Sequence, residues 1–215
     1  MSTHYIHRGL AKINFKENTI EAFKYSFKKK YGVETDLHAT KDNQIVCFHD
    51  FTLKRKFKLN NKIKNISYSK LKKISKKKKA EIPLLKNLLK TSKNKYPLLL
   101  EIKPLFTQQN LFQLLKLLKN KKNCGLISFK EKNLINLYEL QKNLSLGLLF
   151  NSTSSIKNIK LKAKKKHIKF LVLEKKFLSN KKLFLIKKNI YYYTVKNKKT
   201  FNKYKDTKNL IFENL

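Results

Sequence analysis

Short apolar runs alternate with segments whose apolar residues recur at helical spacing along the whole chain. In the first half this pattern predicts strands at 5–7, 33–40, 44–48 and 97–103, and helices that begin near 18 or 19, near 69 and near 84. A turn is expected at 41–43, and residues 51–68 form a polar, irregular connection. The second half predicts the helices 108–121, 131–142, 155–166, 180–188 and 198–205, followed in turn by the strands 125–129, 145–150, 169–174, 190–195 and 209–213.

Strands that alternate with helices indicate a parallel sheet. With 44–48 set apart as a short returning strand, about eight strand–helix units remain. We therefore expect a single domain over residues 1–215, a small (β/α)8 TIM barrel with a short insertion after the second strand. The rival is an open doubly wound sheet, but no glycine-rich phosphate loop follows any strand, and the chain has only 4 glycines.

The sequence predicts neither a transmembrane segment nor a signal peptide. No apolar run reaches the roughly 18–20 residues that a bilayer span needs. The opening Met1–Tyr5 lacks the basic start and apolar stretch of a signal peptide. Two cysteines, Cys47 and Cys124, form no C-x-x-C motif and indicate no disulfide framework. We expect a cytoplasmic protein without a transmembrane segment, and Cys47 as a small buried hydrophobic residue.

The charge is strongly basic, with 52 Lys+Arg against 13 Asp+Glu and a formal net charge of +39. Only Arg8 and Arg55 are arginines, whereas proteins that read bases and phosphates usually enrich arginine because its planar fork binds bidentately. We interpret the lysines as a usage bias that fills solvated faces. This predicts non-specific, salt-sensitive affinity for polyanions and no specific nucleic-acid partner, with a selected polyanion-binding surface as the alternative.

In so basic a chain the acidic residues and histidines are informative. Four of the 5 histidines lie in the first fifty residues, near Glu34, Asp36 and Asp50. On the strand 33–40, Glu34 and Asp36 share one face with His38, and Glu101 shares a face with Lys103 on the strand 97–103. Neighbouring buried carboxylates repel unless a positive group lies between them, and Mg²⁺ or Ca²⁺ with its preference for oxygen ligands would serve. The alternative is that these acids pair with lysines on an exposed strand.

Several short segments occur in a fixed order at close spacing. They are His7-Arg8-Gly9, Glu17-Asn18-Thr19 with Glu21-Ala22-Phe23, Glu34-Thr35-Asp36, Thr40-Lys41-Asp42, His49-Asp50-Phe51-Thr52-Leu53 with Arg55, Ile82-Pro83-Leu84-Leu85, and Glu101-Ile102-Lys103. In this order the chain resembles the glycerophosphodiester phosphodiesterase family. The motifs cover residues 4–103, and the remainder is similar only in its alternation of strands and helices.

The resemblance implies a (β/α)8 barrel that hydrolyses glycerophosphodiesters to glycerol 3-phosphate and an alcohol, in lipid and glycerol metabolism, with one divalent cation, Mg²⁺ or Ca²⁺. It further implies a role for each matching residue: His7 and His49 as general acid and base, Glu34, Asp36 and Glu101 as metal ligands, and Arg8 and Lys103 as phosphate-binding cations. The partner is a small-molecule substrate. Attack by water and attack by the neighbouring glycerol hydroxyl both remain open, as does the oligomeric state.

The chain also departs from the family pattern. Lys16 stands where the family usually has proline, Asn43 replaces a turn glycine, and Tyr193 stands where tryptophan is common and is a candidate substrate wall. The connection 51–68 is short, and the end 211–215 lacks a frequent Thr-Asp-x-Pro. These departures bear on the choice of substrate. Two alternatives remain: a lysophospholipase D acting on lysolipids and, from the net charge of +39, an inactive polyanion-binding barrel.

The remaining histidines receive plainer interpretations. We expect His4 and His38 to pack or to support the site rather than to react. His167 follows Lys164-Lys165-Lys166, and we expect it to be exposed.

Overall fold

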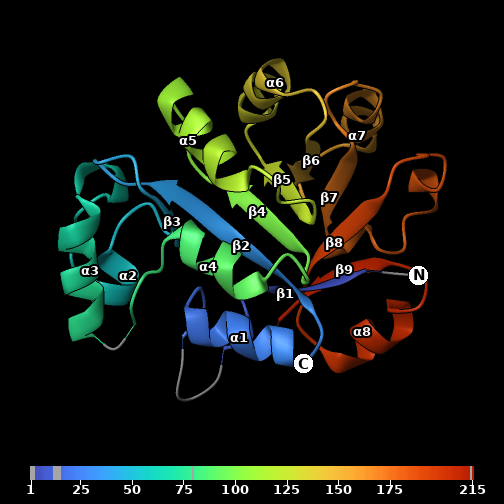
Figure 1. Ribbon diagram of the computed structural model, residues 1–215. Coiled ribbons are helices and arrows are strands. Elements are labelled where there is room, and N and C mark those ends of the chain that lie inside the picture. Colours follow the sequence, from blue (N-terminus) through green and yellow to red (C-terminus); the bar gives the residue numbers. More distant parts are fainter. Residues whose placement is uncertain (1–2, 12–15, 79, 214) are drawn as a thin grey trace.

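The computed structural model describes residues 3–11, 16–78, 80–213 and 215, so Met1, Ser2 and Asn214 of the terminal segments discussed above lie outside the described residues. Its centre is a closed ring of eight parallel strands (Figure 1). In chain order these are β1 (His4–His7), β2 (Gly32–Ala39), β4 (Leu98–Ile102), β5 (Cys124–Ser128), β6 (Ser145–Phe150), β7 (Phe170–Glu174), β8 (Ile190–Val195) and β9 (Asn209–Phe212). Because β1 pairs with both β9 and β2, the sheet has no open gap, which confirms the barrel and excludes the doubly wound rival.

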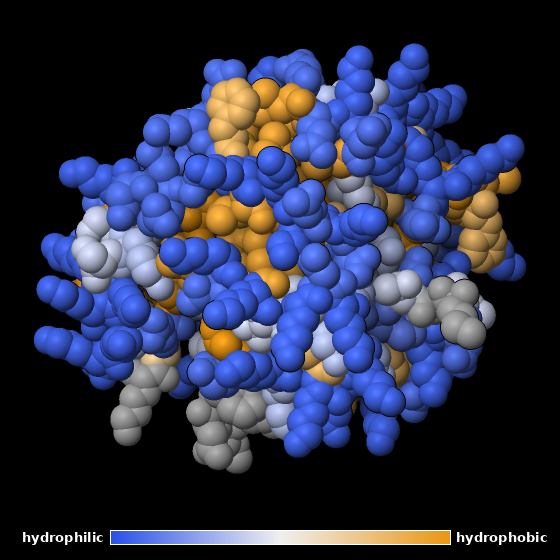
Figure 2. Space-filling view, in the orientation of Figure 1, coloured by the Kyte–Doolittle hydropathy of each residue, from blue (hydrophilic) through white to orange (hydrophobic). Residues whose placement is uncertain are grey.

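Helices lie around the outside of the ring (Figure 1). They are α1 (Ile20–Lys28), α4 (Leu85–Ser92), α5 (Gln108–Leu118), α6 (Glu131–Leu140), α7 (Ile156–Ala163) and α8 (Lys198–Tyr204). Side chains of Thr19, Thr107, Ser155 and Asn197 accept backbone N–H groups at four helix starts, as N-caps do. The main apolar core lies between the outer faces of the strands and the helices. Lysines cover the solvent side, and the face in Figure 2 is accordingly mostly hydrophilic.

An excursion separates β2 from β4. It contains β3 (Ile45–Cys47), which runs antiparallel to β2, then α2 (Lys54–Phe57), the 3₁₀ turn η1 (Ile63–Asn65) and α3 (Tyr68–Lys77). The expectation that 51–68 is only polar and irregular is wrong in part, because Leu53, Phe57 and Ile63 are buried in a second apolar cluster. Single apolar residues spaced through a lysine-rich segment are each buried at a turn, and no sequence periodicity marks such an arrangement.

The helix expected at 180–188 is not formed. Two 3₁₀ turns, η2 (Lys175–Phe177) and η3 (Lys181–Leu183), occupy the chain between β7 and β8. The apolar residues 183–186 form one contiguous run rather than a stripe at helical spacing, so a helix there would not place them all on one buried face. The chain buries Phe177, Leu178 and Leu183 through tight turns instead.

Aromatic rings fill the amino-terminal end of the barrel interior. Phe170 and Tyr5 both contact Tyr191 with ring centroids 5.5 and 5.7 Å apart. A Cβ on Gly147 would lie 2.3 Å from the Phe170 ring, so only glycine fits beside it. These rings close the floor of the barrel interior, so the interior is open to a ligand from the carboxyl ends of the strands. No helix in the described part of the chain is long and apolar enough to cross a membrane.

Candidate active site

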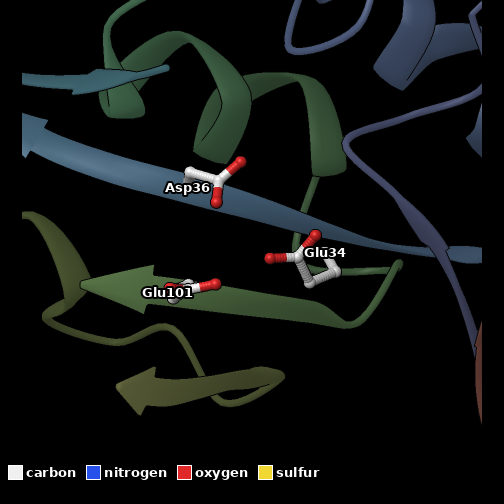
Figure 3. Close-up of side chains that lie close together, drawn as sticks. All are labelled: Glu34, Asp36 and Glu101. Carbon is white, nitrogen blue, oxygen red and sulfur yellow. The ribbon is translucent and has the colours of Figure 1, made fainter. Parts of the chain in front are cut away.

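Three carboxylates converge at the carboxyl-terminal end of the barrel. Glu34 and Asp36 alternate along β2 and so share its inner face, and Asp36 is the register partner of Glu101 on the neighbouring strand β4. All three are buried. One carboxylate oxygen of each lies within 4.8 Å of the others, and Figure 3 shows the three groups directed toward a common point.

Two cations accompany these acids. Lys103 Nζ lies 2.9 Å from Glu101 Oε1 and 3.5 Å from Asp36 Oδ1, and Arg8 Nε lies 3.1 Å from Asp36 Oδ2. Arg8 has a positive φ of 56° and its backbone N–H donates to the Glu34 carbonyl oxygen at 2.8 Å. This turn directs the guanidinium over the end of β2, beside Asp36. Three buried carboxyl groups thus face two positive charges.

The imbalance is visible in the pKa values. Burial, and then repulsion from Asp36, raises the pKa of Glu101 to about 7, and burial with repulsion from Asp36 and Glu101 raises the pKa of Glu34 well above its usual value. Burial also opposes ionisation of Asp36, but Arg8 and Lys103 outweigh it and lower the pKa of Asp36. The repulsion that remains would be relieved by one more positive charge within the cluster.

The donor set fits a hard divalent cation. Carboxylate oxygens are the ligands that Mg²⁺ and Ca²⁺ prefer, and here they come from two neighbouring, rigidly paired strands. Three buried carboxylates with raised pKa values on two of them are costly without a compensating charge. Glu34, Asp36 and Glu101 would hold the ion.

Each of the two candidate catalytic histidines bonds a carboxylate through Nδ1. His7, at the end of β1, has Nδ1 3.2 Å from Glu213 Oε2 and Nε2 3.9 Å from Glu34 Oε2. His49 has Nδ1 2.7 Å from Asp50 Oδ1. These bonds favour the tautomer with Nδ1 protonated, so that Nε2 of His49 can accept a proton. Burial is the main cause that lowers the pKa of His49, which favours a neutral ring at pH 7.

The segment before α1 organises the same end of the barrel. Asn18, with a positive φ of 57°, donates from its backbone to the Arg8 carbonyl oxygen at 2.7 Å and from Nδ2 to Asp36 Oδ2 at 3.1 Å. Its Oδ1 accepts the Thr35 hydroxyl at 2.6 Å. Asparagine suits this position because its short amide tolerates the left-handed conformation. Asn18 thus joins the Arg8 turn to β2.

Arg8, Arg55 and Lys56 form a cationic rim around the site, and Glu17 and Asp50 hold these side chains in place. Glu17 lies 3.2 Å from Arg8 Nη1, 2.9 Å from Arg55 Nη2 and 3.1 Å from Lys56 Nζ. Arg55 Nε donates to Asp50 Oδ2 at 2.7 Å, and this carboxylate in turn holds His49. A chain of charge-assisted hydrogen bonds therefore runs from Arg8 through Glu17, Arg55 and Asp50 to His49.

Sequence reasoning did not single out Glu17, Asn18 or Glu213 as site residues. The first two belong to the Glu17-Asn18-Thr19 motif, which indicated a helix start rather than a contact with Asp36. Glu213 is an acidic residue at the end of the last strand of a lysine-rich chain. That same signal led to Glu34 and Asp36 and would have led to Glu213.

The other histidines have mostly structural places. His38 is buried with Nε2 3.2 Å from the His49 carbonyl oxygen, and burial lowers the pKa of His38 to about 4, so it supports the His49 backbone as a neutral ring. His4 Nδ1 accepts from the backbone of Leu210 at 3.3 Å. The exposed position expected for His167 is wrong, because its Nε2 lies 3.1 Å from Glu131 in an ion cluster between α6 and α7. Three lysines before it gave no sign of that partner.

A cavity of about 470 Å³ opens above the carboxylates. The site residues line one side of it, and Ile127, Phe129, Leu149 and Tyr193 line another. The Tyr193 hydroxyl donates to the Phe150 carbonyl oxygen at 3.1 Å, and its ring lies edge-on to Phe129 with centroids 6.2 Å apart. Tyr193 therefore presents its ring to the cavity, as a wall does.

The fold and the site define a (β/α)8 barrel with a cluster of three buried carboxylates and two carboxylate-bound imidazoles at the carboxyl ends of its strands. Residues 7–211 match the Glycerophosphoryl diester phosphodiesterase family, and the chain belongs to this family.

The relatives agree with this assignment. The human protein "Lysophospholipase D GDPD1" is 42% identical over 72 residues, and its rat counterpart is 39% identical over 72 residues. That match covers 33% of this chain and only 23% of either relative.

Solved structures share the fold across the chain. A glycerophosphodiester phosphodiesterase from Thermotoga maritima aligns with a TM-score of 0.83 at 24% identity, covering 100% of this chain and 95% of that one. An Oleispira antarctica phosphodiesterase in complex with the product sn-glycerol-3-phosphate aligns with a TM-score of 0.81 at 19% identity, covering 99% and 92%.

Proposed function

We propose that this chain, as a single domain over residues 1–215, is a metal-dependent phosphodiesterase that hydrolyses glycerophosphodiesters to glycerol 3-phosphate and an alcohol. The observation that carries the proposal is the set of three buried carboxylates within 4.8 Å of one another, flanked by two carboxylate-bound imidazoles. Family membership and the solved relatives support it.

Charge neutralisation is the first task of the site. A phosphodiester is anionic and repels nucleophiles, and its transition state gathers more charge on the equatorial oxygens. Arg8 and Lys103 border the carboxylate cluster and would bind the phosphate oxygens. A bound divalent ion, Mg²⁺ or Ca²⁺, would supply Lewis-acid stabilisation of the same charge.

The two imidazoles divide the proton transfers. Nε2 of His49 takes the proton of the attacking hydroxyl as its oxygen bonds to phosphorus. His7 enters the step as the imidazolium, with protons on both ring nitrogens, and gives the Nε2 proton to the alkoxide as the bond to the alcohol breaks. Asp50 and Glu213 hold the rings in the orientations that this requires. The attacking hydroxyl belongs either to water or to the glycerol carbon next to the ester, which would give a cyclic phosphate first.

A second candidate function is a lysophospholipase D activity on lysolipids. It is favoured by the apolar side of the cleft, with Ile127, Phe129, Leu149 and Tyr193, and by the local similarity to "Lysophospholipase D GDPD1". A comparison of the turnover rates for glycerophosphocholine and for lysophosphatidylcholine distinguishes the two candidate functions. An inactive polyanion-binding barrel would turn over neither substrate and would bind nucleic acid in a salt-dependent manner.

Release of glycerol 3-phosphate from glycerophosphocholine tests the main proposal. We expect activity with Mg²⁺ or Ca²⁺, none with EDTA, and recovery when the ion is restored. His49→Ala should lower kcat by about 10²–10⁴-fold, the usual range for a general acid or base. His167→Gln is the matched control, because His167 lies between α6 and α7, away from the cleft, and it should turn over like wild type. Wild-type turnover in folded His49→Ala would refute the acid–base assignment.

A further inference from the structure

The chain between β7 and β8 contains four consecutive apolar residues flanked by two pairs of lysines. Its sequence is Lys181-Lys182-Leu183-Phe184-Leu185-Ile186-Lys187-Lys188, and we name residues 181–188 the basic–apolar loop. Leu183 is buried in the core, whereas Phe184 is 65% and Leu185 78% exposed. In the described part of the chain no other large hydrophobic residue is as exposed as these two.

The neighbouring helix α7 also carries apolar side chains on its surface. Leu161 on α7 is also exposed, and a groove of about 400 Å³ between α7 and the loop is lined by Ala163, Leu185, Ile186 and lysines. Figure 1 shows this part of the chain on the outside of the barrel, and Figure 2 shows apolar side chains projecting among hydrophilic ones at the same edge.

The surroundings are predominantly cationic. Residues 155–190 contain thirteen lysines and one acidic residue, Glu174, and Glu131 of α6 pairs with Lys162 and Lys165 of this stretch. Lys208 adds another positive charge, with Nζ 4.4 Å from the centre of the Phe184 ring. A surface that combines projecting apolar side chains with flanking lysines is complementary to an anionic lipid surface, which offers acyl chains beneath negative headgroups.

We propose that the basic–apolar loop docks this protein on anionic lipid bilayers. Phe184 and Leu185 enter the boundary between headgroups and acyl chains, and the flanking lysines contact the anionic headgroups. A nucleic acid would attract the same lysines, but it would leave the aliphatic Leu185 in water. The exposed leucine therefore favours lipid as the partner.

The place of the loop in the fold sets how the protein would lie on the bilayer. Lys188 Nζ donates to the carbonyl oxygens of Lys165 (3.0 Å) and Ile168, which belong to the segment that leads into the amino-terminal end of β7. The candidate active site is at the carboxyl ends of the strands. Docking through the loop thus leaves the cleft open to water and to soluble diesters.

Co-sedimentation with lipid vesicles tests the proposal. The vesicles contain phosphatidylcholine alone or phosphatidylcholine mixed with phosphatidylglycerol. We expect wild type to bind the mixed vesicles, and Leu185→Ser to bind them about tenfold more weakly because burial of one leucine is lost. Leu105→Ser is the matched control, since Leu105 is 56% exposed but follows β4 at the opposite end of the barrel. It should bind as wild type does.

Charge is tested in the same assay. The triple variant Lys181→Gln, Lys182→Gln and Lys187→Gln should lose more binding to the mixed vesicles than Lys70→Gln, Lys73→Gln and Lys76→Gln, which removes three exposed lysines of α3. Equal losses in the two triple variants would indicate general electrostatic attraction and overturn the proposal. Wild-type binding by Leu185→Ser, or an equal loss in Leu105→Ser, would also overturn it.

Two further measurements keep the outcomes distinct. Hydrolysis of glycerophosphocholine by Leu185→Ser should equal that of wild type, which shows that the variant is folded. If wild type lacks this activity, the catalytic proposal fails but the docking proposal can still be tested. Circular dichroism then shows that the variants are folded, and sedimentation measures their binding to the vesicles. If Leu185→Ser weakens binding to a single-stranded RNA as much as binding to vesicles, the lipid assignment is wrong.

Discussion

The two halves of the barrel differ in the side chains that point into the barrel at the same level along its axis. Asp36 on β2 is in register with Glu101 on β4, and Glu101 is in register with Ile127 on β5. One step around the ring replaces a buried carboxylate by a buried aliphatic side chain. Beyond it, Leu149 and Tyr193 continue the apolar side of the cleft. The comparison teaches that two neighbouring strands, β2 and β4, carry the clustered carboxylates, while β5, β6 and β8 turn the apolar wall toward the same cleft.

The largest expected effect is the loss of hydrolysis when a carboxylate of the charged half is replaced, compared with a replacement in the apolar half. Asp36→Asn removes a charge of the proposed metal site and the partner of Arg8 and Lys103, so we expect hydrolysis to fall by about 10³-fold or more. Ile127→Val, in the same layer on β5, should keep turnover within a few-fold and cost about 0.5–1.5 kcal/mol of stability. Steady-state kinetics and urea unfolding of both variants measure the contrast. Equal losses of turnover would mean that the charged half has no special role.

Glu213 tests whether the last strand belongs to the charged half. Its carboxylate bonds His7 Nδ1, and this hydrogen bond is the main cause that lowers the pKa of Glu213 to about 2. Glu213→Gln should lower kcat by about 10–100-fold, the usual size for a residue that orients a reacting group, with little change in KM. Glu213→Asp should recover part of the activity. An unchanged kcat and pH profile in Glu213→Gln would remove Glu213 from the site.

Gly147 tests the closed floor beneath the cleft. Because a Cβ there would lie 2.3 Å from Phe170, Gly147→Ala should destabilise the fold by about 1–3 kcal/mol through overpacking. Gly125→Ala meets its nearest atom at 2.8 Å, at the end of the flexible Leu99 side chain, and should cost less. Equilibrium unfolding measures both. A Gly147→Ala protein as stable as wild type would show that Phe170 can move aside freely.

The smallest effect concerns an ion cluster in the second half of the chain. Burial opposes ionisation of Glu131, but Lys162 and Lys165 outweigh it and lower the pKa of Glu131 to about 2. Because this folded pKa lies below the usual value of about 4.3, the cluster stabilises the fold above that pH and loses its effect as the pH falls toward 2. Glu131→Gln should therefore be less stable than wild type at pH 7 and nearly equal to it near pH 2. A difference that stays constant across this range would contradict the assignment.

The sequence predicted most of the fold because its signals are local. Eight strands were placed within about two residues of their observed bounds, since each is a short apolar run between amphipathic segments. The helix expected at 180–188 failed because a contiguous apolar run carries no helical period. The burial of Phe57 and Ile63 escaped notice for a related reason, since isolated apolar residues define no face until the chain has folded.

The alternation on β2 was enough to place Glu34 and Asp36 on one face, and the motif order was enough to name His7, Arg8, His49, Glu101 and Lys103. The distances between these side chains could not be predicted from the sequence, because the distance between residues on different strands depends on the register of the strands. The bond between Asn18 and Asp36 depends on a left-handed turn, and the bond between His7 and Glu213 joins residues from opposite ends of the chain.

By itself the sequence determined which residue types recur at which period, and hence the order of strands and helices, the family and the chemistry of the candidate groups. Only the tertiary structure decided that β1 pairs with both β2 and β9, and this closure brings Glu213 to His7. The register between β2 and β4 brings the three carboxylates together. It alone also decided that Leu183 is buried while Phe184 and Leu185 face outward. The physical reason is that period and composition are properties of neighbouring residues, whereas register, closure and exposure are set by contacts between segments far apart along the chain.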